Sequence, residues 1–119
     1  MTKIDKLIAY LSEKKHKLVQ GYVVARNDGI LIHSTLRETD PHLAAVMAAI
    51  IGSSETFIQS TGAHVRNVTV LIESTEINVL MTGTGKSALL AVITRPDVET
   101  YMLIPHVQAV CNGIAKILD

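Results

Sequence analysis

One stretch of this 119-residue sequence has the residue types of a phosphate-binding loop. The run Gly83–Ser87, GTGKS, imitates the end of the pattern GxxxxGK[ST], in which backbone N–H groups and a lysine hold phosphates. That pattern needs a glycine at position 80, where this chain has Leu80, and a helix after the lysine. A strand-like run, SALLAVIT, follows instead. The glycines therefore indicate a hairpin turn, and we expect no nucleotide or other cofactor.

The remaining chemically active residue types are scattered along the chain. The five histidines lack the i,i+4 spacing of a helical metal site, and the one cysteine, Cys111, falls on an apolar helical stripe. His33 and His42 flank one loop, but two separate surface histidines are the simpler interpretation. Ser34 beside His33 does not make a nucleophile with a base. The sequence therefore predicts no metal site, no catalytic residues and no enzyme.

Charge and composition exclude several classes of protein. Eleven basic residues balance eleven acidic ones, which argues against a large nucleic-acid-binding surface. An apolar content of 48% with 18% charged residues predicts a single globular domain over residues 1–119. We interpret the lysines concentrated in the first seventeen residues as a solvated helix face, with a membrane or partner contact as the alternative. One cysteine, no apolar leader and no long apolar span predict a cytoplasmic protein.

Hydrophobic spacing predicts the elements that position these residues. The expected order is helix, two strands, helix, three strands and helix, over residues 2–16, 18–26, 30–35, 41–60, 66–74, 77–82, 87–94 and 98–118. Asn27-Asp28-Gly29 is a hairpin turn, because these residues tolerate positive φ. Pro105 predicts a kink in the last helix or a helix that begins near it, and Asp97 is a candidate cap. No strand–helix–strand unit repeats regularly, so the fold class is α+β with an antiparallel sheet.

The helix that begins at Pro41 is apolar on two faces. We expect its larger residues to pack on the sheet, namely Leu43, Val46, Met47, Ile50, Ile51, Phe57 and Ile58. The small residues on the opposite face would let another helix approach: Ala45, Ala48, Ala49, Gly52 and Thr56. The strand with Val68, Val70 and Ile72 would offer unpaired backbone groups if it lay at a sheet edge. These features predict a homodimer. The alternative is an internal strand and a helix face covered by the first or last helix.

The chain resembles the roadblock / dynein light chain family. The resemblance rests on the hairpin GYVVARNDGILIHST, with Gly21, Asp28-Gly29 and Ser34, and on the alanine-rich helix 43–52 at the right distance after it. It implies a five-stranded antiparallel sheet in the order 2-1-5-4-3, sandwiched between the central helix and the two terminal helices. It also implies dimers joined through the third strand and the central helix.

The resemblance further implies a protein that has no catalytic centre and binds a Ras-like small GTPase as a regulator or scaffold. A paralogous roadblock protein is a second expected partner. The candidate GTPase-facing residues are Arg37, which lies in a polar loop, His42 and Glu55. The alternative function is a small-ligand sensor or adaptor module of profilin- or longin-like architecture within a larger complex.

Overall fold

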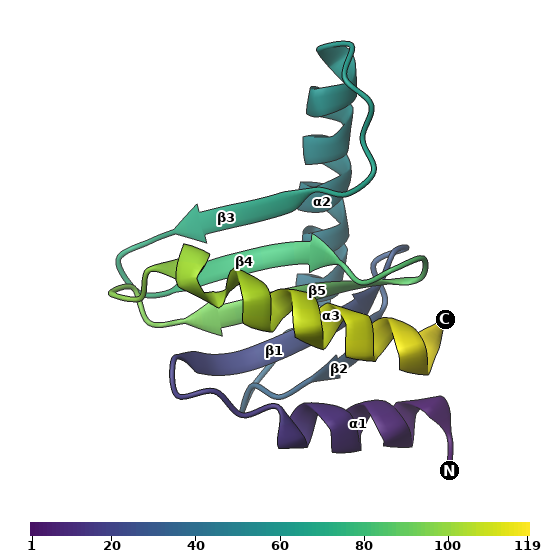
Figure 1. Cartoon of the computed structure of the whole chain (residues 1–119), viewed down its shortest axis with the longest axis vertical. Helices are drawn as coiled ribbons and strands as arrows, with labels where there is room; N and C mark the ends of the chain where they lie inside the picture. Colours follow the sequence, from purple (N-terminus) through teal and green to yellow (C-terminus); the bar gives the residue numbers. More distant parts are fainter.

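A five-stranded antiparallel sheet with helices on both faces forms the protein (Figure 1). The computed structural model describes all residues, 1–119. The helices are α1 (Lys3–Glu13), α2 (His42–Ser60) and α3 (Ile104–Leu118), with the 3-10 helix η1 (Thr100–Leu103) directly before α3. The strands are β1 (Val19–Arg26), β2 (Leu31–Ser34), β3 (Thr69–Glu73), β4 (Asn78–Gly83) and β5 (Ala88–Thr94). Their order in the sheet is β2-β1-β5-β4-β3, so the α+β class and the strand order are confirmed, and β3 forms one edge.

Local sequence signals explain where the first elements begin and turn. The Thr2 hydroxyl accepts the N–H of Asp5 at 3.1 Å, and the Asp5 carboxylate accepts the N–H of Thr2 at 3.2 Å. This reciprocal pair satisfies two backbone donors that the start of α1 would otherwise leave free. Gly29 has a φ of 89° in the turn between β1 and β2, and it donates its N–H to the Arg26 carbonyl at 2.9 Å. The predicted hairpin is therefore confirmed.

Alternation along the central strands builds a separate apolar core on each face of the sheet. Tyr22 and Val24 of β1 belong to the core beneath α1 and α3, whereas Val23 and Ala25 belong to the core beneath α2. Every residue of the central strand β5 is buried. The sheet is therefore sandwiched between α2 on one face and the two terminal helices on the other, as expected.

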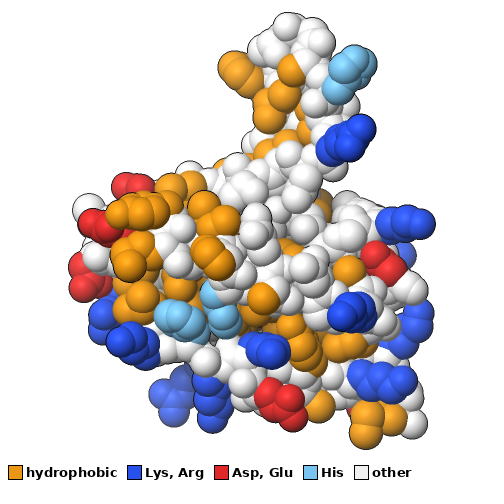
Figure 2. Space-filling model, in the orientation of Figure 1, with side chains coloured by type: hydrophobic (Ala, Val, Ile, Leu, Met, Phe, Trp, Pro, Cys, Tyr) orange, Lys and Arg blue, Asp and Glu red, His pale blue; other side chains and the backbone are white.

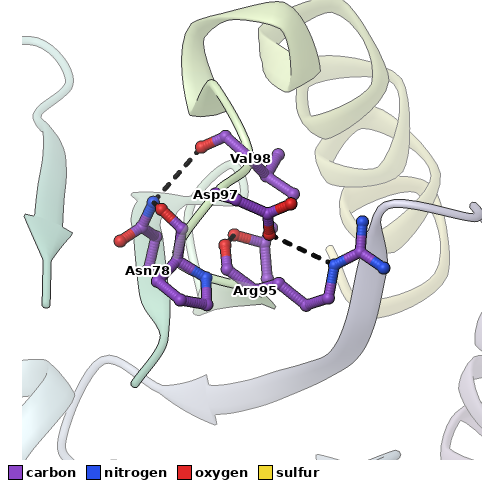
Figure 3. Close-up of polar contacts among 6 residues, drawn as sticks. Asn78, Arg95, Asp97 and Val98 are labelled. Carbon is purple, nitrogen blue, oxygen red and sulfur yellow. Dashed lines mark hydrogen bonds and ion pairs between the residues drawn. The ribbon is translucent and has the colours of Figure 1, made fainter. Parts of the chain in front are cut away.

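The last helix begins at Ile104, so Pro105 lies in its first turn, where a missing N–H costs nothing. The second of the two alternatives for Pro105 is confirmed, and the helix has no proline kink. The expectation that Asp97 caps this helix is wrong. The Asp97 carboxylate instead lies 3.3 Å from Nε of Arg95, within the loop after β5 (Figure 3).

A buried asparagine fixes the loop that leads from β5 to η1. The side-chain amide of Asn78, at the start of β4, donates to the carbonyls of Pro96 and Val98 at 3.2 Å each (Figure 3). Its Oδ1 accepts the N–H of Ser74 at 3.2 Å. One side chain therefore joins the β3–β4 turn to the segment before η1, and leaves none of its own polar atoms unsatisfied.

The core-facing side of α2 differs from the expectation at two positions. Ala44, Met47 and Ile51 are its buried residues. Val46 is 50% exposed and Phe57 is 73% exposed, so placing them in the core was wrong. Each residue advances an α-helix by about 100°, which turns Val46 and Phe57 well away from the line of Met47 and Ile51. The end of α2 also extends beyond β3, where the sheet no longer lies beneath it (Figure 1).

Candidate functional site

The phosphate-loop-like sequence forms the hairpin turn between β4 and β5, as predicted. Thr84 donates its N–H to the Ala88 carbonyl at 2.9 Å, and Gly85 has a φ of 85°. The Lys86 N–H donates to the Asp119 carboxylate at 2.9 Å, and the Ser87 hydroxyl donates to the same carboxylate. The Ser87 hydrogen bond, followed by that of the Lys86 N–H, lowers the pKa of Asp119. The Lys86 N–H and the Ser87 hydroxyl are therefore both bonded to Asp119, directly after α3, and are not available to a phosphate.

The titratable side chains do not assemble into a metal-binding cluster. No group of three or more His, Cys, Asp or Glu side chains lies close enough to hold a metal ion. Cys111 is buried on the α3 side of the sheet, and burial raises the pKa of its thiol to about 11. A protonated, enclosed thiol is a poor nucleophile. His16, Tyr22 and His106 do approach one another, at the end of α1.

The outer face of α2 is exposed and mostly apolar. It comprises Ala45, Val46, Ala49, Gly52, Thr56 and Phe57, all of which are exposed. Ala48 is half-buried and packs against the core beneath α2, so part of its side chain is covered within the monomer. The helix therefore presents to solvent two large apolar side chains as well as the small residues picked out from the sequence.

An open edge strand lies beside this helix. β3 pairs only with β4, from Thr69 opposite Thr82 to Glu73 opposite Asn78, and its other edge is free. Val68 is buried and Val70 half-buried, while Ile72 is 37% exposed. A groove with a volume of about 500 Å³ separates β3 from the end of α2, and its apolar lining residues are Phe57, Ile58, Val68, Val70 and Leu71. Free backbone groups and an apolar groove are what a further strand and helix would need in order to dock here.

By length and composition, α2 would also suffice to cross a membrane, and 17% of its apolar window is buried within the chain. Two observations favour a helix that packs on protein. Its inner face is committed to the sheet through Ala44, Met47 and Ile51. Its second half also carries polar residues around the axis, including Glu55 and Gln59, which a bilayer core would disfavour.

The three candidate GTPase-facing residues do not form one compact site. Arg37 is exposed in the loop before α2, and His42 is exposed in the first turn, where its Nδ1 lies 2.9 Å from the Asp40 carboxylate. That carboxylate also accepts the N–H of His42 at 2.9 Å, and this bond is the main cause of its lowered pKa. Glu55 is half-buried and lines a cavity with Arg66. Thirteen residues of helix separate it from His42, which corresponds to roughly 20 Å.

Two features of the surface were not found by sequence reasoning. Exposure of Val46 and Phe57 was missed because both faces of α2 are apolar, and the hydrophobic pattern does not show which side chains the sheet covers. A cavity between the end of α1 and the strands β1 and β2 was missed because residues from three separate segments line it. The basic run after α1 was the only signal in the sequence that could have pointed to this cavity.

Comparison with known structures supports the fold. A solved structure of MglB with a tetrameric arrangement is 12% identical to this chain and superposes with a TM-score of 0.82, covering 98% of this chain and 90% of the other. The gliding protein MglB from Thermus thermophilus is also 12% identical, with a TM-score of 0.80 and coverage of 98% and 91%. A Roadblock/LC7 domain from Streptomyces avermitilis is 17% identical, with a TM-score of 0.75 and coverage of 92% and 95%.

The sequence itself supplies the family assignment. No curated protein sequence matches the chain at a significant level. The sequence profile of the Roadblock/LC7 domain matches residues 11–94, well over half of the chain, from the end of α1 to the last strand. Together with the strand order and the helices on both faces of the sheet, this match shows that the chain belongs to the Roadblock/LC7 family.

Proposed function

We propose that this protein is a non-enzymatic, homodimeric regulator or scaffold that binds a Ras-like small GTPase. The observation that carries the proposal is the exposed apolar outer face of α2 beside the free edge of β3. Phe57 at 73% exposed and Val46 at 50% exposed are costly to leave in water, since burying one large apolar side chain contributes about 1.5–3 kcal/mol.

In the proposed dimer, β3 pairs antiparallel with β3 of a second copy across a two-fold axis. The two sheets then become continuous, and the free N–H and C=O groups of β3 gain partners. The same axis brings the outer faces of both α2 helices together. The small side chains of Ala45, Ala49 and Gly52 allow a close approach of the two helices. The end of α2 that extends past β3 would lie over the partner's sheet (Figure 1).

The interface that we propose contains the residues suggested by the sequence: Ala45, Ala48, Ala49, Gly52, Thr56, Val68, Val70 and Ile72. Phe57 is added because of its exposure. A heterodimer with a paralogous roadblock protein would use the same edge and helix. We place the assembly in the cytoplasm, where its proposed GTPase partner would be found.

The GTPase partner is proposed from the family resemblance, and the gliding protein MglB among the structural neighbours is consistent with a regulatory role. Arg37 and His42 are the favoured contacts, since both are exposed at one end of α2. Glu55 is a secondary candidate because it is half-buried. The Arg37 guanidinium at this position is suited to an acidic side chain on the partner.

Binding can be measured by calorimetry with purified Ras-like GTPases from the same cell, each loaded with GDP or with a GTP analogue. We expect one GTPase to bind in a nucleotide-dependent manner. Replacing Arg37 and His42 together with Glu should weaken that binding by about tenfold or more, through repulsion and lost ion pairs. Lys116→Glu, an exposed change on α3, is the matched control and should leave the affinity nearly unchanged. If no GTPase binds the intact dimer in either nucleotide state, the GTPase part of the proposal is wrong.

A further inference from the structure

The largest cavity of the protein lies on the side of the sheet opposite α2. It has a volume of about 600 Å³ and opens between the end of α1, the loop after it, the start of β1 and the end of β2. A cavity of this size is within the range of small-molecule binding sites. Neither the proposed dimer nor the proposed GTPase contacts use this region.

The lining of this cavity is basic. Lys14, Lys15, His16 and His33 line it, and no Asp or Glu does. The complete chain has no net charge, so this is a local surplus of positive charge. Figure 2 shows Lys or Arg and His side chains gathered at the lower left of the molecule, where Figure 1 places the end of α1. The basic sequence after α1, which the proposed function leaves unexplained, therefore lies at the cavity.

Hydrogen bonds hold the segment 14–16 at the cavity wall. Nδ1 of His16 accepts the N–H of Leu18 at 3.1 Å, so the ring proton is on Nε2 and that nitrogen is a donor. The Tyr22 hydroxyl donates to the Lys14 carbonyl at 2.7 Å and lies 2.6 Å from Nε2 of His106. His106 in turn lies beside the His16 ring, with 4.8 Å between the ring centroids. These contacts hold the 14–16 segment in place, which lowers the entropic cost of binding a ligand there.

Lys14 and Lys15 form no ion pair within the protein. Burial, and after it the neighbouring His16 and Lys14, lower the pKa of His106. The Lys14 ammonium lies 5.2 Å from the centroid of the Tyr10 ring, so an aromatic face is its neighbour there. Lys15 is exposed and has no hydrogen bond or ion pair to the protein. An anion in the cavity would pair with these lysines.

We propose that this cavity binds a phosphate monoester, through the Lys15 ammonium and the His16 Nε2–H, with His33 of β2 as a further lining residue. A phosphate monoester has a charge near −2 at neutral pH and three strong acceptor oxygens, which suits several separate donors. Ile8, Leu11 and Val19 also line the cavity and would contact the organic part of the ligand. The phosphate can belong to a soluble metabolite or to a phospholipid headgroup.

Two probes with the same phosphate group distinguish these sources. Glycerol 3-phosphate is titrated into the protein by calorimetry, and co-sedimentation is measured with phosphatidylcholine vesicles that contain or lack phosphatidic acid. We expect saturable binding of at least one probe. Binding of glycerol 3-phosphate supports a metabolite, whereas binding of phosphatidic acid vesicles alone supports a lipid headgroup. The proposal is overturned if neither probe binds the wild-type protein.

The decisive variant replaces Lys15 and His16 together with Gln. Loss of two charge-assisted or oriented hydrogen bonds should weaken binding by about tenfold or more. Lys6→Gln with His64→Gln is the matched control, because it removes one lysine and one histidine outside the cavity. Lys15→Gln alone, at an exposed position, keeps the test valid if the double variant is unstable. Wild-type affinity in both cavity variants would also overturn the proposal, and an unchanged dimer mass would show that the outcome is independent of the α2 interface.

Discussion

Ala49→Glu is the sharpest test of the α2 interface. Ala49 is exposed in the middle of the outer face of α2, so a Glu side chain there reaches water in the monomer. Glu is a good helix former, and surface substitutions usually change the free energy of unfolding by less than about 0.5 kcal/mol. Ala48→Glu would be less informative, because Ala48 is half-buried against the monomer core.

The expected effect on the dimer is much larger than the effect on the fold. Because the proposed dimer is two-fold symmetric, both chains carry the substitution at the same interface. Two carboxylates would therefore be desolvated there and would repel each other. An unpaired buried charge costs several kcal/mol, and even about 2 kcal/mol for each chain gives about 4 kcal/mol for the dimer. That loss raises the dissociation constant of the dimer by about 1,000-fold.

Light scattering coupled to size-exclusion chromatography, over a series of concentrations, measures this change. The parent should have about twice the 12.9 kDa mass of one chain, and Ala49→Glu should have the mass of a single chain. Ala9→Glu provides the matched control, since it places the same substitution at an exposed position of α1, on the opposite side of the sheet. A variant that remains as dimeric as the parent, with an unchanged melting temperature, would refute the proposed interface.

Three further predictions concern the monomer. Asn78→Ala should lower the free energy of unfolding in urea by about 2 kcal/mol, because the Val98 carbonyl loses its buried donor and the Pro96 carbonyl loses the same amide; a change below about 0.5 kcal/mol would contradict this role. Asp119 has a lowered pKa in the folded protein, so its contribution to stability is present above about pH 4 and is lost as the pH falls further. The melting temperature of Asp119→Asn should therefore fall less steeply than that of the parent as the pH is lowered into the acid range. The same fall in melting temperature for variant and parent would argue against the contact. Cys111, with a thiol pKa raised to about 11, should react with a thiol reagent at neutral pH only after unfolding. A rate in the native protein equal to that of a small free thiol would show that the side chain is accessible.

Much of the fold followed from local signals. The capping residues Thr2 and Asp5, the turn at Gly29 and the alternation along β1 each specify a nearby conformation, and the structure contains all three. Strand boundaries were predicted less accurately, because pairing with a neighbouring strand decides where a strand begins and ends. The third strand was expected over 66–74 but is Thr69–Glu73, because only these residues lie opposite β4.

The last segment shows why helix boundaries need tertiary information. The apolar pattern continues from Val98 through Pro105 without a break, so it predicts one helix. The bonds from Asn78 hold Val98 in a loop, and α3 begins only after η1. Asp97 is then engaged by Arg95 and is too far along the chain to cap α3.

By itself, the sequence determined the order and type of the elements, the two-faced apolar character of α2, and, through its family resemblance, the arrangement of the strands. These properties depend on periodicity and turn chemistry, which act over a few residues. Only the tertiary structure decided that Val46 and Phe57 face solvent and that Ala48 is half-buried against the core. The same holds for the basic cavity, whose walls come from α1, β1 and β2. Burial and cavities depend on where distant segments of the chain meet, and a local pattern does not contain that information.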